Sequence, residues 1–373
     1  MTKKKILLVF GTRPEAIKMA PVYREFKYRD YQFETKICVT GQHREMLDQV
    51  LEFFDIIPDY DLNLMKPNQS LYGVTSDIIM GMKNVLEDFN PDYVLVHGDT
   101  TTTMAASLAS FYHGSKVCHV EAGLRTHNKR SPFPEEINRQ IVGRIADYHF
   151  TPTQFSKSNL IKENIEDENI VVTGNSVIDA LFQSIEKIKE NPSSLVQSLE
   201  IEMEGRDVIL VTGHRRENHG NKFLEICEAL KEIAVTNKSI KIVYPVHLNP
   251  QVQKPVYDLL RDVDNIMLLN PLDYKDFIWL MNRSMLIITD SGGIQEEAPS
   301  LGKPVLVIRD ITERPEAVEA GTVILVGTSK SKIVEECNSL LSDNLRKENM
   351  SALHNPYGDG KASERIADFL SNL

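Results

Sequence analysis

The sequence of 373 residues has few cysteines, a single tryptophan and no long apolar segment. Its four cysteines lie far apart and form no C-x-x-C pair, which argues against a disulfide framework and a thiolate zinc site. The longest apolar runs, such as residues 6–10 and 285–288, are far shorter than the roughly 20 residues that a membrane span needs. We therefore expect a cytoplasmic protein that does not interact with a membrane.

An excess of positive charge is also missing. The chain has 42 Lys and Arg against 53 Asp and Glu, a net charge of −11. This balance predicts no extended basic surface and therefore no nucleic-acid partner. Taken alone, it also disfavours an anionic substrate.

Several well-known motifs are absent as well. The chain contains neither G-x-G-x-x-G nor the P-loop pattern, so binding of a dinucleotide or a nucleoside triphosphate through these motifs is not supported. No G-x-S-x-G elbow marks a serine nucleophile. The ten histidines are scattered without H-E-x-x-H, and we predict no metal site.

Short β-branched runs alternate with longer helical patterns along the chain, which predicts parallel sheets with right-handed crossovers. The runs are almost entirely apolar, as expected of strands buried on both faces. The candidate strands are residues 5–10, 35–40, 93–96, 116–120, 148–151 and 170–173, then 208–212, 241–244, 266–269, 286–289, 304–307 and 323–326. Helical patterns include residues 70–88, 101–112, 222–235 and 332–341.

The alternation breaks once, in the polar segment 185–207, which we interpret as the connection between two domains. At about 150 residues per domain, the length also predicts two. We predict an N-terminal Rossmann-like domain over residues 1–175, with the helical segment 359–373 packing back on it, and a C-terminal one over 176–358. Two doubly wound parallel-sheet domains would place their ligand sites at a shared central cleft.

Unusual residues gather where the first predicted strand ends. Thr12 is placed to cap the following helix, Pro14 suits its first turn, and Gly11 permits close approach of the backbone. A helix start that carries Arg13 and Lys18 could bind an anion. An ordinary strand-to-helix turn with two surface cations explains the segment equally well.

Three acidic residues follow later strands of the first domain. Asp99 comes after a buried strand, although Asp99 or Thr100 could simply cap the next helix. Glu121 is harder to explain structurally, because a carboxylate at the rim of a sheet needs a partner or a task. Glu135 follows the long irregular stretch 126–133, and stabilisation of a helix N-terminus is the stronger explanation for it alone.

The second domain offers groups that suit a phosphate. His214 and Arg215 follow a buried strand, where an imidazole beside cations suits phosphate contact or proton transfer, although a histidine that caps local carbonyls explains the residue comparably well. The strand at 286–289 runs into Ser291-Gly292-Gly293 and a helix, an arrangement typical of a phosphate cradle. Glu297, one turn later, could hold ribose hydroxyls, and Arg314 adds a cation at another helix start.

With these segments in place, the chain resembles the non-hydrolysing UDP-N-acetylglucosamine 2-epimerases over essentially its whole length. The matching segments are FGTRPEAIKMAP at 10–21, CVTGQHREMLDQV at 38–50, VHGDTTTT at 96–103, HVEAGLRT at 119–126, PEEINR at 134–139, VTGHRREN at 211–218, YPVHLNP at 244–250, TDSGGIQEEAPSLGKPVLV at 289–307, TERPEAV at 312–318 and NPYGDGKA at 355–362.

The resemblance implies a GT-B-like α/β fold and a homodimer. It implies reversible conversion of UDP-N-acetylglucosamine to UDP-N-acetylmannosamine in the cytoplasm, which supplies cell-surface polysaccharide synthesis. UDP would be eliminated to leave a bound 2-acetamidoglucal and would then add back, without a nicotinamide or any other cofactor. A GT-B glycosyltransferase, a hydrolysing epimerase and a non-enzymatic UDP-sugar sensor are the alternatives.

The resemblance also assigns roles to residues. It implies that Asp99, Glu121 and Glu135 are the acid–base candidates, and it leaves open which removes the proton and which returns it. The remaining assignments are Arg13, Lys18 and His214 at the sugar-phosphate region, Ser291, Gly292 and Gly293 at the pyrophosphate, Glu297 at the ribose, Arg314 at the nucleotide end, and Phe277 with the main chain of Leu272 near the uracil.

Members of the family are often activated by UDP-N-acetylglucosamine at a second site. The positions that match this allosteric site are Gln42, His43, Arg215 and His247. Glu45 replaces a glutamine that some members have there, and Leu272 stands where some have a glutamine near the uracil. The first departure puts the details of regulation in doubt.

Overall fold

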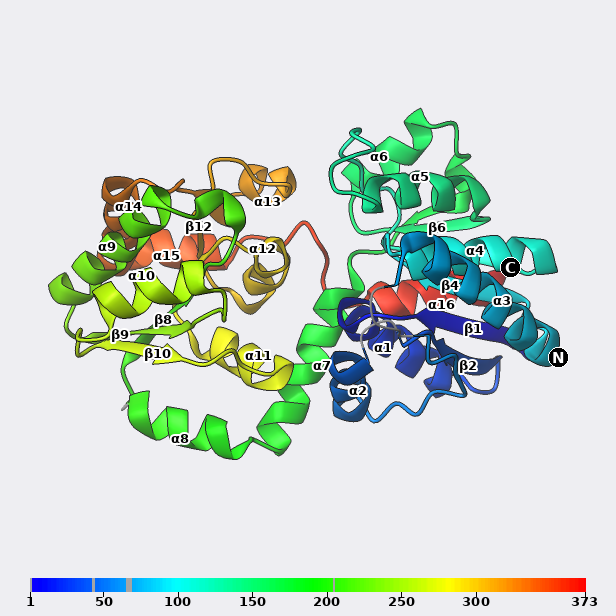
Figure 1. The fold of residues 1–373 in the computed structure, drawn as a ribbon, viewed down its shortest axis with the longest axis horizontal. Coiled ribbons are helices and arrows are strands. Elements are labelled where there is room, and N and C mark those ends of the chain that lie inside the picture. Colours follow the sequence, from blue (N-terminus) through cyan, green and yellow to red (C-terminus); the bar gives the residue numbers. More distant parts are fainter. Residues whose placement is uncertain (1, 42–43, 65–68, 204) are drawn as a thin grey trace. The chain divides into compact units, whose positions relative to one another are not determined.

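The computed structural model describes residues 2–41, 44–64, 69–203 and 205–373 (Figure 1). By their internal contacts these form two compact units, Met1–Ala180 with Tyr357–Leu373, and Leu181–Pro356. The boundary falls inside helix α7 (Ser176–Glu190). Each unit contains one sheet whose strand pairs are all parallel, flanked by helices, so the predicted α/β class is confirmed.

The first unit has a seven-stranded sheet in the order β3-β2-β1-β4-β5-β6-β7. The six predicted strands are all present. The sequence missed the seventh, β3, because it has only two residues, Tyr60 and Asp61, at the edge of the sheet. The elements are β1 (Lys4–Phe10), α1 (Arg13–Tyr28), β2 (Phe33–Val39), α2 (Arg44–Phe53), β3 (Tyr60–Asp61), α3 (Leu71–Phe89), β4 (Tyr93–His97), α4 (Thr101–His113), β5 (Lys116–Val120), α5 (Glu135–Ile145), β6 (Tyr148–Thr151), α6 (Gln154–Lys162), η1 (Asp167–Asn169), β7 (Ile170–Val172), the first part of α7, and α16 (Ala362–Asn372).

The second unit has a six-stranded sheet in the order β10-β9-β8-β11-β12-β13, and all six strands match the predicted runs. Its elements are the rest of α7, α8 (Ser194–Met203), β8 (Asp207–Thr212), η2 (Arg216–Asn218), α9 (Asn221–Thr236), β9 (Ile240–Pro245), α10 (Pro250–Leu260), β10 (Ile266–Leu269), α11 (Tyr274–Arg283), β11 (Leu286–Thr289), α12 (Gly292–Glu297), η3 (Ala298–Leu301), β12 (Val305–Val307), α13 (Pro315–Glu319), β13 (Val323–Leu325), α14 (Lys330–Ser342) and α15 (Asn344–Ser351).

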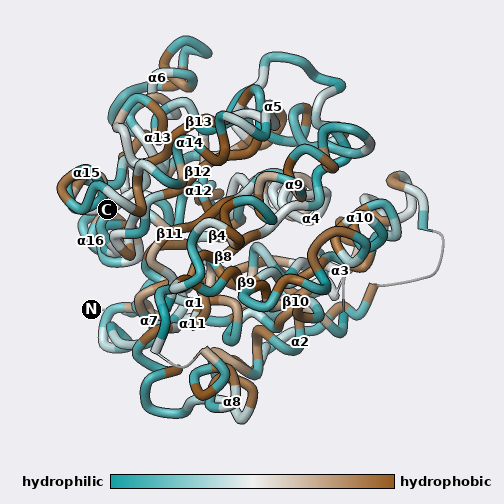
Figure 2. Tube along the Cα trace, turned by 90° about the vertical axis from the view of Figure 1, so that its left-hand side faces the viewer, coloured by the Kyte–Doolittle hydropathy of each residue, from teal (hydrophilic) through white to brown (hydrophobic). Residues whose placement is uncertain are grey.

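Burial explains why the strands could be found from the sequence. Residues 6–10 of β1 are completely buried, because helices cover both faces of the sheet. The helices instead bury one stripe: α3 buries Val74, Ile78, Met82 and Val85 at helical spacing. Figure 2 shows the same contrast, with hydrophobic colouring along the inner strands and mixed colouring along the helices.

The last helix, α16, packs against α1 within the first unit. The ammonium group of Lys4 donates a 2.7 Å hydrogen bond to the carbonyl of Leu370 near the end of α16. At the other end, the buried carboxylate of Asp179 accepts hydrogen bonds from the N–H groups of Ala362 and Ser363. These contacts satisfy polar groups at both ends of the helix.

The predicted connection at 185–207 is largely helical. It contains the end of α7 and the whole of α8, whose Leu199 and Met203 are buried. In the part of the chain that the structure describes, no helix is long and apolar enough to cross a membrane.

Candidate active site

The loops that follow β1 and β4 are joined by one buried carboxylate, that of Glu15. Its Oε2 accepts hydrogen bonds from the N–H groups of Gly11 and Thr12, at 3.0 and 2.8 Å. Its Oε1 accepts from the hydroxyls of Thr100 and Thr103, at 2.7 and 3.1 Å. Burial raises the pKa of Glu15, and the hydrogen bonds partly oppose that rise. Thr12 caps α1 as predicted, and Glu15 completes the capping box.

Glu121 is the first residue after β5, and its backbone is left-handed with a φ of 62°. Its Oε1 forms an ion pair with Lys18 from α1 and accepts a 3.0 Å hydrogen bond from Nδ2 of Asn175. The Oδ1 of Asn175 accepts from the N–H of Val177, which leaves Nδ2 to face the carboxylate. The structure therefore brings together two predicted site residues, Lys18 and Glu121, and fixes the carboxylate from separate segments.

A buried histidine adjoins the other oxygen of the same carboxylate. Nε2 of His97, the last residue of β4, lies 3.8 Å from Oε2 of Glu121. Burial lowers the pKa of His97 to about 4, against the opposing effect of Glu121. The imidazole is therefore neutral near pH 7.

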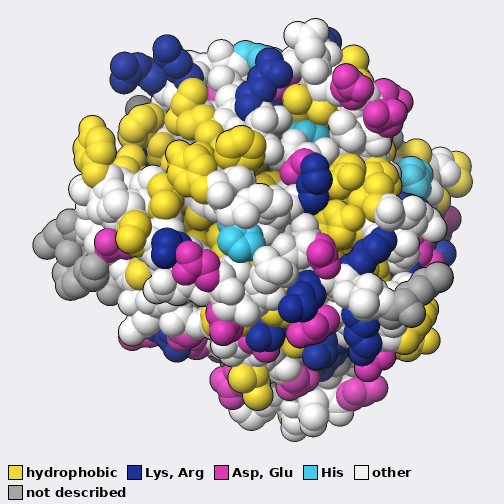
Figure 3. Space-filling model, turned by 90° about the vertical axis from the view of Figure 1, so that its right-hand side faces the viewer, with side chains coloured by type: hydrophobic (Ala, Val, Ile, Leu, Met, Phe, Trp, Pro, Cys, Tyr) yellow, Lys and Arg dark blue, Asp and Glu magenta, His cyan; other side chains and the backbone are white. Residues whose placement is uncertain are grey.

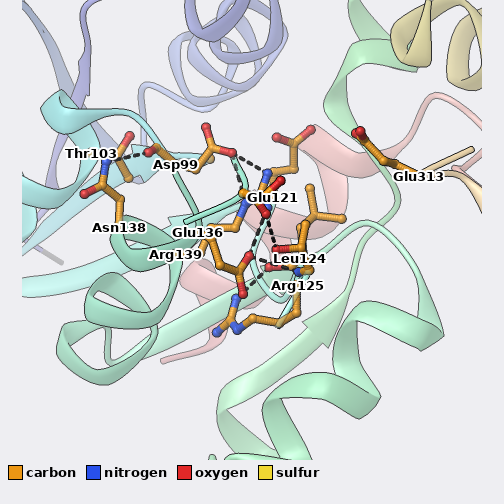
Figure 4. A network of polar contacts seen from close by, with 12 residues as sticks. Asp99, Thr103, Glu121, Leu124, Arg125, Glu136, Asn138, Arg139 and Glu313 are labelled. Carbon is orange, nitrogen blue, oxygen red and sulfur yellow. Dashed lines mark hydrogen bonds and ion pairs between the residues drawn. The ribbon is translucent and has the colours of Figure 1, made fainter. Parts of the chain in front are cut away.

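Asp99 belongs to a second ion-pair network in the same unit (Figure 4). Its Oδ2 accepts hydrogen bonds from Nε and Nη2 of Arg139, at 3.0 and 2.6 Å, and its carbonyl accepts from Asn138. Arg139 also donates to the buried carboxylate of Glu136. The residue that caps α4 is Thr100 and not Asp99, so helix capping does not explain the Asp99 carboxylate.

Two neighbouring carboxylates at the start of α5 differ in burial. Glu135, the first residue of the helix, is half-buried, whereas Glu136 is completely buried. Glu136 accepts hydrogen bonds from the N–H groups of Thr126 and His127, so it holds the long loop before α5 in place. Burial alone would raise the pKa of Glu136, but these bonds, with those from Gln140 and Arg139, lower it overall. Arg13, by contrast, is exposed at the start of α1.

In the second unit, Asp290 joins the loops after β8 and β11. It is completely buried, and its Oδ2 accepts hydrogen bonds from the N–H groups of His214 and Arg215, both at 2.8 Å. Its Oδ1 lies 3.7 Å from Nδ1 of His214, whose ring stacks on that of His247 with 5.1 Å between centroids. Burial lowers the pKa of His214, against the effect of Asp290. His214 is therefore a neutral imidazole fixed on two sides.

Two guanidinium groups approach the glycine-rich start of α12. A Cβ atom placed on Gly292 would lie 3.8 Å from Nη2 of Arg314 and 3.9 Å from Nη2 of Arg215. Arg314 is oriented by an ion pair with the buried carboxylate of Glu296. The structure thus places cations beside the backbone of Gly292, as a pyrophosphate would require, whereas the N–H of Ser291 donates to the hydroxyl of Thr289 at 2.9 Å. Arg215, predicted for the second site, also lies beside Gly292.

The predicted nucleoside contacts lie on neighbouring segments of the same unit. Leu272 precedes α11 and Phe277 lies within it, both half-buried. The carboxylate of Glu297 lies 3.4 Å from the Cβ position of Gly293. Glu297 also helps to raise the pKa of Tyr274, although burial is the larger cause. Gln42 and His43, predicted for the allosteric site, lie outside the described residues.

Sequence reasoning missed several residues that organise these groups. Four of them occur inside the matching segments, namely Glu15, His97, Arg139 and Asp290, but nothing in the local pattern reveals which groups their side chains contact. Asn175 lies outside those segments, and its contact with Glu121 depends on pairing across the fold. Among the described residues, no group of His, Cys, Asp and Glu side chains could hold a metal ion.

Two parallel sheets with polar, charge-rich loops at the carboxyl ends of the strands define a GT-B-like α/β protein. The family model described as UDP-N-acetylglucosamine 2-epimerase matches residues 25–371, and the chain belongs to this family.

Individual relatives cover nearly all of the chain. A UDP-N-acetylglucosamine 2-epimerase of Campylobacter jejuni is 60% identical over 375 residues, which span 98% of this chain and 97% of the relative. The crystal structure of the Neisseria meningitidis UDP-GlcNAc 2-epimerase bound to UDP-GlcNAc has a TM-score of 0.85 and 52% identity, covering 99% and 100% of the two chains. A putative epimerase of Listeria monocytogenes has a TM-score of 0.94 and 46% identity, with 100% and 96% covered.

The contacts of Glu136 predict how acid affects stability. Because the folded protein holds the pKa of Glu136 below its ordinary value of 4.5, ionisation of this group stabilises the fold above about pH 4.5 and stops doing so as pH falls through the lowered value. Glu136→Gln should therefore reduce the free energy of unfolding by about 2 kcal/mol at neutral pH. The difference from wild type should narrow as pH falls below about 4.5, as measured by urea unfolding.

Glu135→Gln is the matched control, since it changes the adjacent carboxylate in the same helical turn. Because Glu135 is only half-buried, we expect its substitution to change the unfolding free energy by less than about 0.5 kcal/mol. Equal losses in the two variants, or a Glu136→Gln loss that is independent of pH, would contradict the role given to Glu136.

Proposed function

We propose that this protein interconverts UDP-N-acetylglucosamine and UDP-N-acetylmannosamine by inverting carbon 2 of the sugar. The observation that carries the proposal is the Glu121 carboxylate, which Lys18 and Asn175 hold at the end of a buried strand. A carboxylate oriented in this way suits proton transfer at carbon. Membership of the family and the named substrate of the Neisseria relative support the choice of substrate.

The proposed reaction removes a weakly acidic proton. The carbon 2 proton is taken by a carboxylate while the bond from carbon 1 to UDP breaks, which leaves a 2-acetamidoglucal and free UDP in the site. UDP then adds back to carbon 1, and carbon 2 receives a proton on its opposite face. Asp99, Glu121 and Glu135 are the proposed acid–base groups, and the order in which they act is left open.

The second unit is proposed to bind UDP. Loss of UDP develops negative charge on the pyrophosphate, which the Ser291-Gly292-Gly293 turn, through the N–H groups of its two glycines, and the guanidinium group of Arg314 can stabilise. His214, whose Nδ1 lies 3.7 Å from Oδ1 of Asp290, is assigned to contact the sugar-phosphate region. We assign Glu297 to the ribose, Phe277 and the main chain of Leu272 to the uracil, and Arg13 with Lys18 to the sugar-phosphate region.

The proposal is tested by incubating the protein with UDP-N-acetylglucosamine alone in deuterated buffer. We expect UDP-N-acetylmannosamine that carries deuterium at carbon 2, because the removed proton exchanges with solvent before its return. Mass spectrometry and proton NMR of the separated nucleotide sugars measure both features.

The same experiment separates the alternatives. A GT-B glycosyltransferase would release UDP only when an acceptor sugar is added. A hydrolysing epimerase would release free N-acetylmannosamine and UDP, and a sensor would bind without product. Epimerised product without deuterium would contradict elimination.

A second prediction concerns the two fixed carboxylates. Asp99→Asn and Glu121→Gln should each reduce kcat at least about a hundredfold, because an amide cannot take up the proton. Neither carboxylate is assigned to UDP, so the Kd of UDP measured by calorimetry should change by less than about threefold. Asp258→Asn, an exposed ion-pair residue of α10, controls for an isosteric surface change. Near-wild-type turnover in both site variants would refute their roles.

Finer properties of the family belong to the same proposal. We place the reaction in the cytoplasm, in a route to cell-surface polysaccharide, and the four free, buried cysteines are consistent with a reducing compartment. A homodimer is supported by large exposed apolar side chains on α3 and α4, among them Met80, Phe111 and Tyr112. Figure 3 shows apolar side chains in groups between charged ones on one face of the molecule.

Activation by UDP-N-acetylglucosamine at a second site involving Gln42, His43, Arg215 and His247 is also proposed. Its support is the stacking of His247 on His214, which connects this set to a proposed substrate-binding residue. A dimer should show about twice the 42.3 kDa chain mass in light scattering. Activation by the substrate at a second site should give a sigmoidal dependence of the rate on the concentration of UDP-N-acetylglucosamine. His247→Ala should lower the Hill coefficient. A monomer with hyperbolic kinetics would contradict both features.

A further inference from the structure

His97 is a buried histidine without a role in the proposed chemistry, and it faces the carboxylate of Glu121, one of the proposed acid–base groups. His97 ends β4, is 3% exposed, and its Nε2 has no hydrogen-bond partner among the described residues. A buried nitrogen without a partner is costly, and such atoms are rare in folded proteins. The nearby acidic group is Oε2 of Glu121, at 3.8 Å.

The ionisable groups near the imidazole of His97 are Glu121, Lys18 and His119. Lys18 from α1 contacts Oε1 of Glu121, and an adjacent cation favours the ionised carboxylate. From β5, His119 also acts on His97 and donates its own Nε2–H to the carbonyl of Gly98 at 2.7 Å. The imidazole of His97 is neutral and carries a single N–H, and the tautomer with this proton on Nε2 can offer it to the carboxylate without adding a second cation.

We propose that His97 is a positioning residue for the reaction: its Nε2–H donates to Oε2 of Glu121 when substrate binds, and thereby fixes the orientation of the carboxylate and favours its ionised form. The inference rests on the proposed function. A 3.8 Å separation is longer than a hydrogen bond, and bonds of this kind commonly shorten in the substrate complex. Lys18 and Asn175 contact Oε1, and a donor at Oε2 acts on the second oxygen of the same carboxylate.

The test uses two amides that reach different positions of the imidazole. In His97→Gln the side-chain amide reaches the place of Nε2, whereas in His97→Asn it reaches only that of Nδ1. We expect His97→Asn to reduce kcat at least about tenfold with a KM within about threefold of wild type, and to move the acidic limb of the kcat profile to higher pH by about one unit. His97→Gln should recover most of the rate and return the limb towards its wild-type position.

His149→Asn is the matched control for the loss of a buried imidazole. His149 lies on β6 in register with His119, and the charged groups that act on its ring are Arg125, Asp147 and Glu163. This variant should lower the melting temperature without moving the pH limb. If both His97 variants lose activity equally with unmoved limbs, or if His149→Asn moves the limb as His97→Asn does, the role of His97 is only structural and the proposal is overturned.

A measurement without substrate distinguishes this inference from the proposed function. In nitrogen-15 NMR of the wild-type protein, we expect His97 to remain neutral near pH 7 with its proton on Nε2, and to change its shift in Glu121→Gln. A proton on Nδ1, or no response to Glu121→Gln, would overturn the role of His97 even in an active epimerase. Absence of epimerised product from the wild-type protein would overturn the proposed function, whatever the tautomer.

Discussion

One buried carboxylate in each unit holds the loops at the point where the order of strands reverses. In the first sheet this point lies between β1 and β4, and Glu15 bonds the N–H groups after β1 to hydroxyls at the start of α4. In the second it lies between β8 and β11, and Asp290 bonds the N–H groups after β8. When both faces of a sheet are buried, the loops after its strands carry main-chain N–H groups that no strand pairs with. A buried carboxylate can accept hydrogen bonds from these N–H groups. Glu15 also completes the cap of α1, the helix that carries Lys18, and Asp290 fixes the backbone of His214.

The consequence is that the proposed catalytic groups stand on fixed backbone. Glu121 emerges from a left-handed residue directly after β5, and its carboxylate is held from α1 by Lys18 and from the start of α7 by Asn175. His214 is held by main-chain bonds to Asp290 and by its stack on His247. Preorganisation of this kind reduces the reorganisation that the reaction itself must accomplish.

The sequence predicted the fold well because the strands are continuous apolar runs, a signal that does not depend on contacts across the chain. All six predicted strands of the second sheet, and the capping role of Thr12, are confirmed. The two-residue β3 has no such signal. The site was harder to predict, because the roles of Arg139 and Asn175 come from pairs 40 and 54 residues apart along the chain. Such pairs depend on which strands become neighbours, and local patterns do not specify that order.

The structure removes the argument that the net charge of −11 disfavours an anionic substrate. Glu15, Glu136 and Asp290 are buried acceptors of main-chain N–H groups, and they do not contribute to a repulsive outer surface. Around Gly292, meanwhile, the guanidinium groups of Arg314 and Arg215 lie close to a glycine-rich helix start. Attraction of an anion depends on this local arrangement, since charges more than about 10 Å away are largely screened at physiological salt. An acidic protein can therefore bind a pyrophosphate, and its overall charge argues only against extended polyanions.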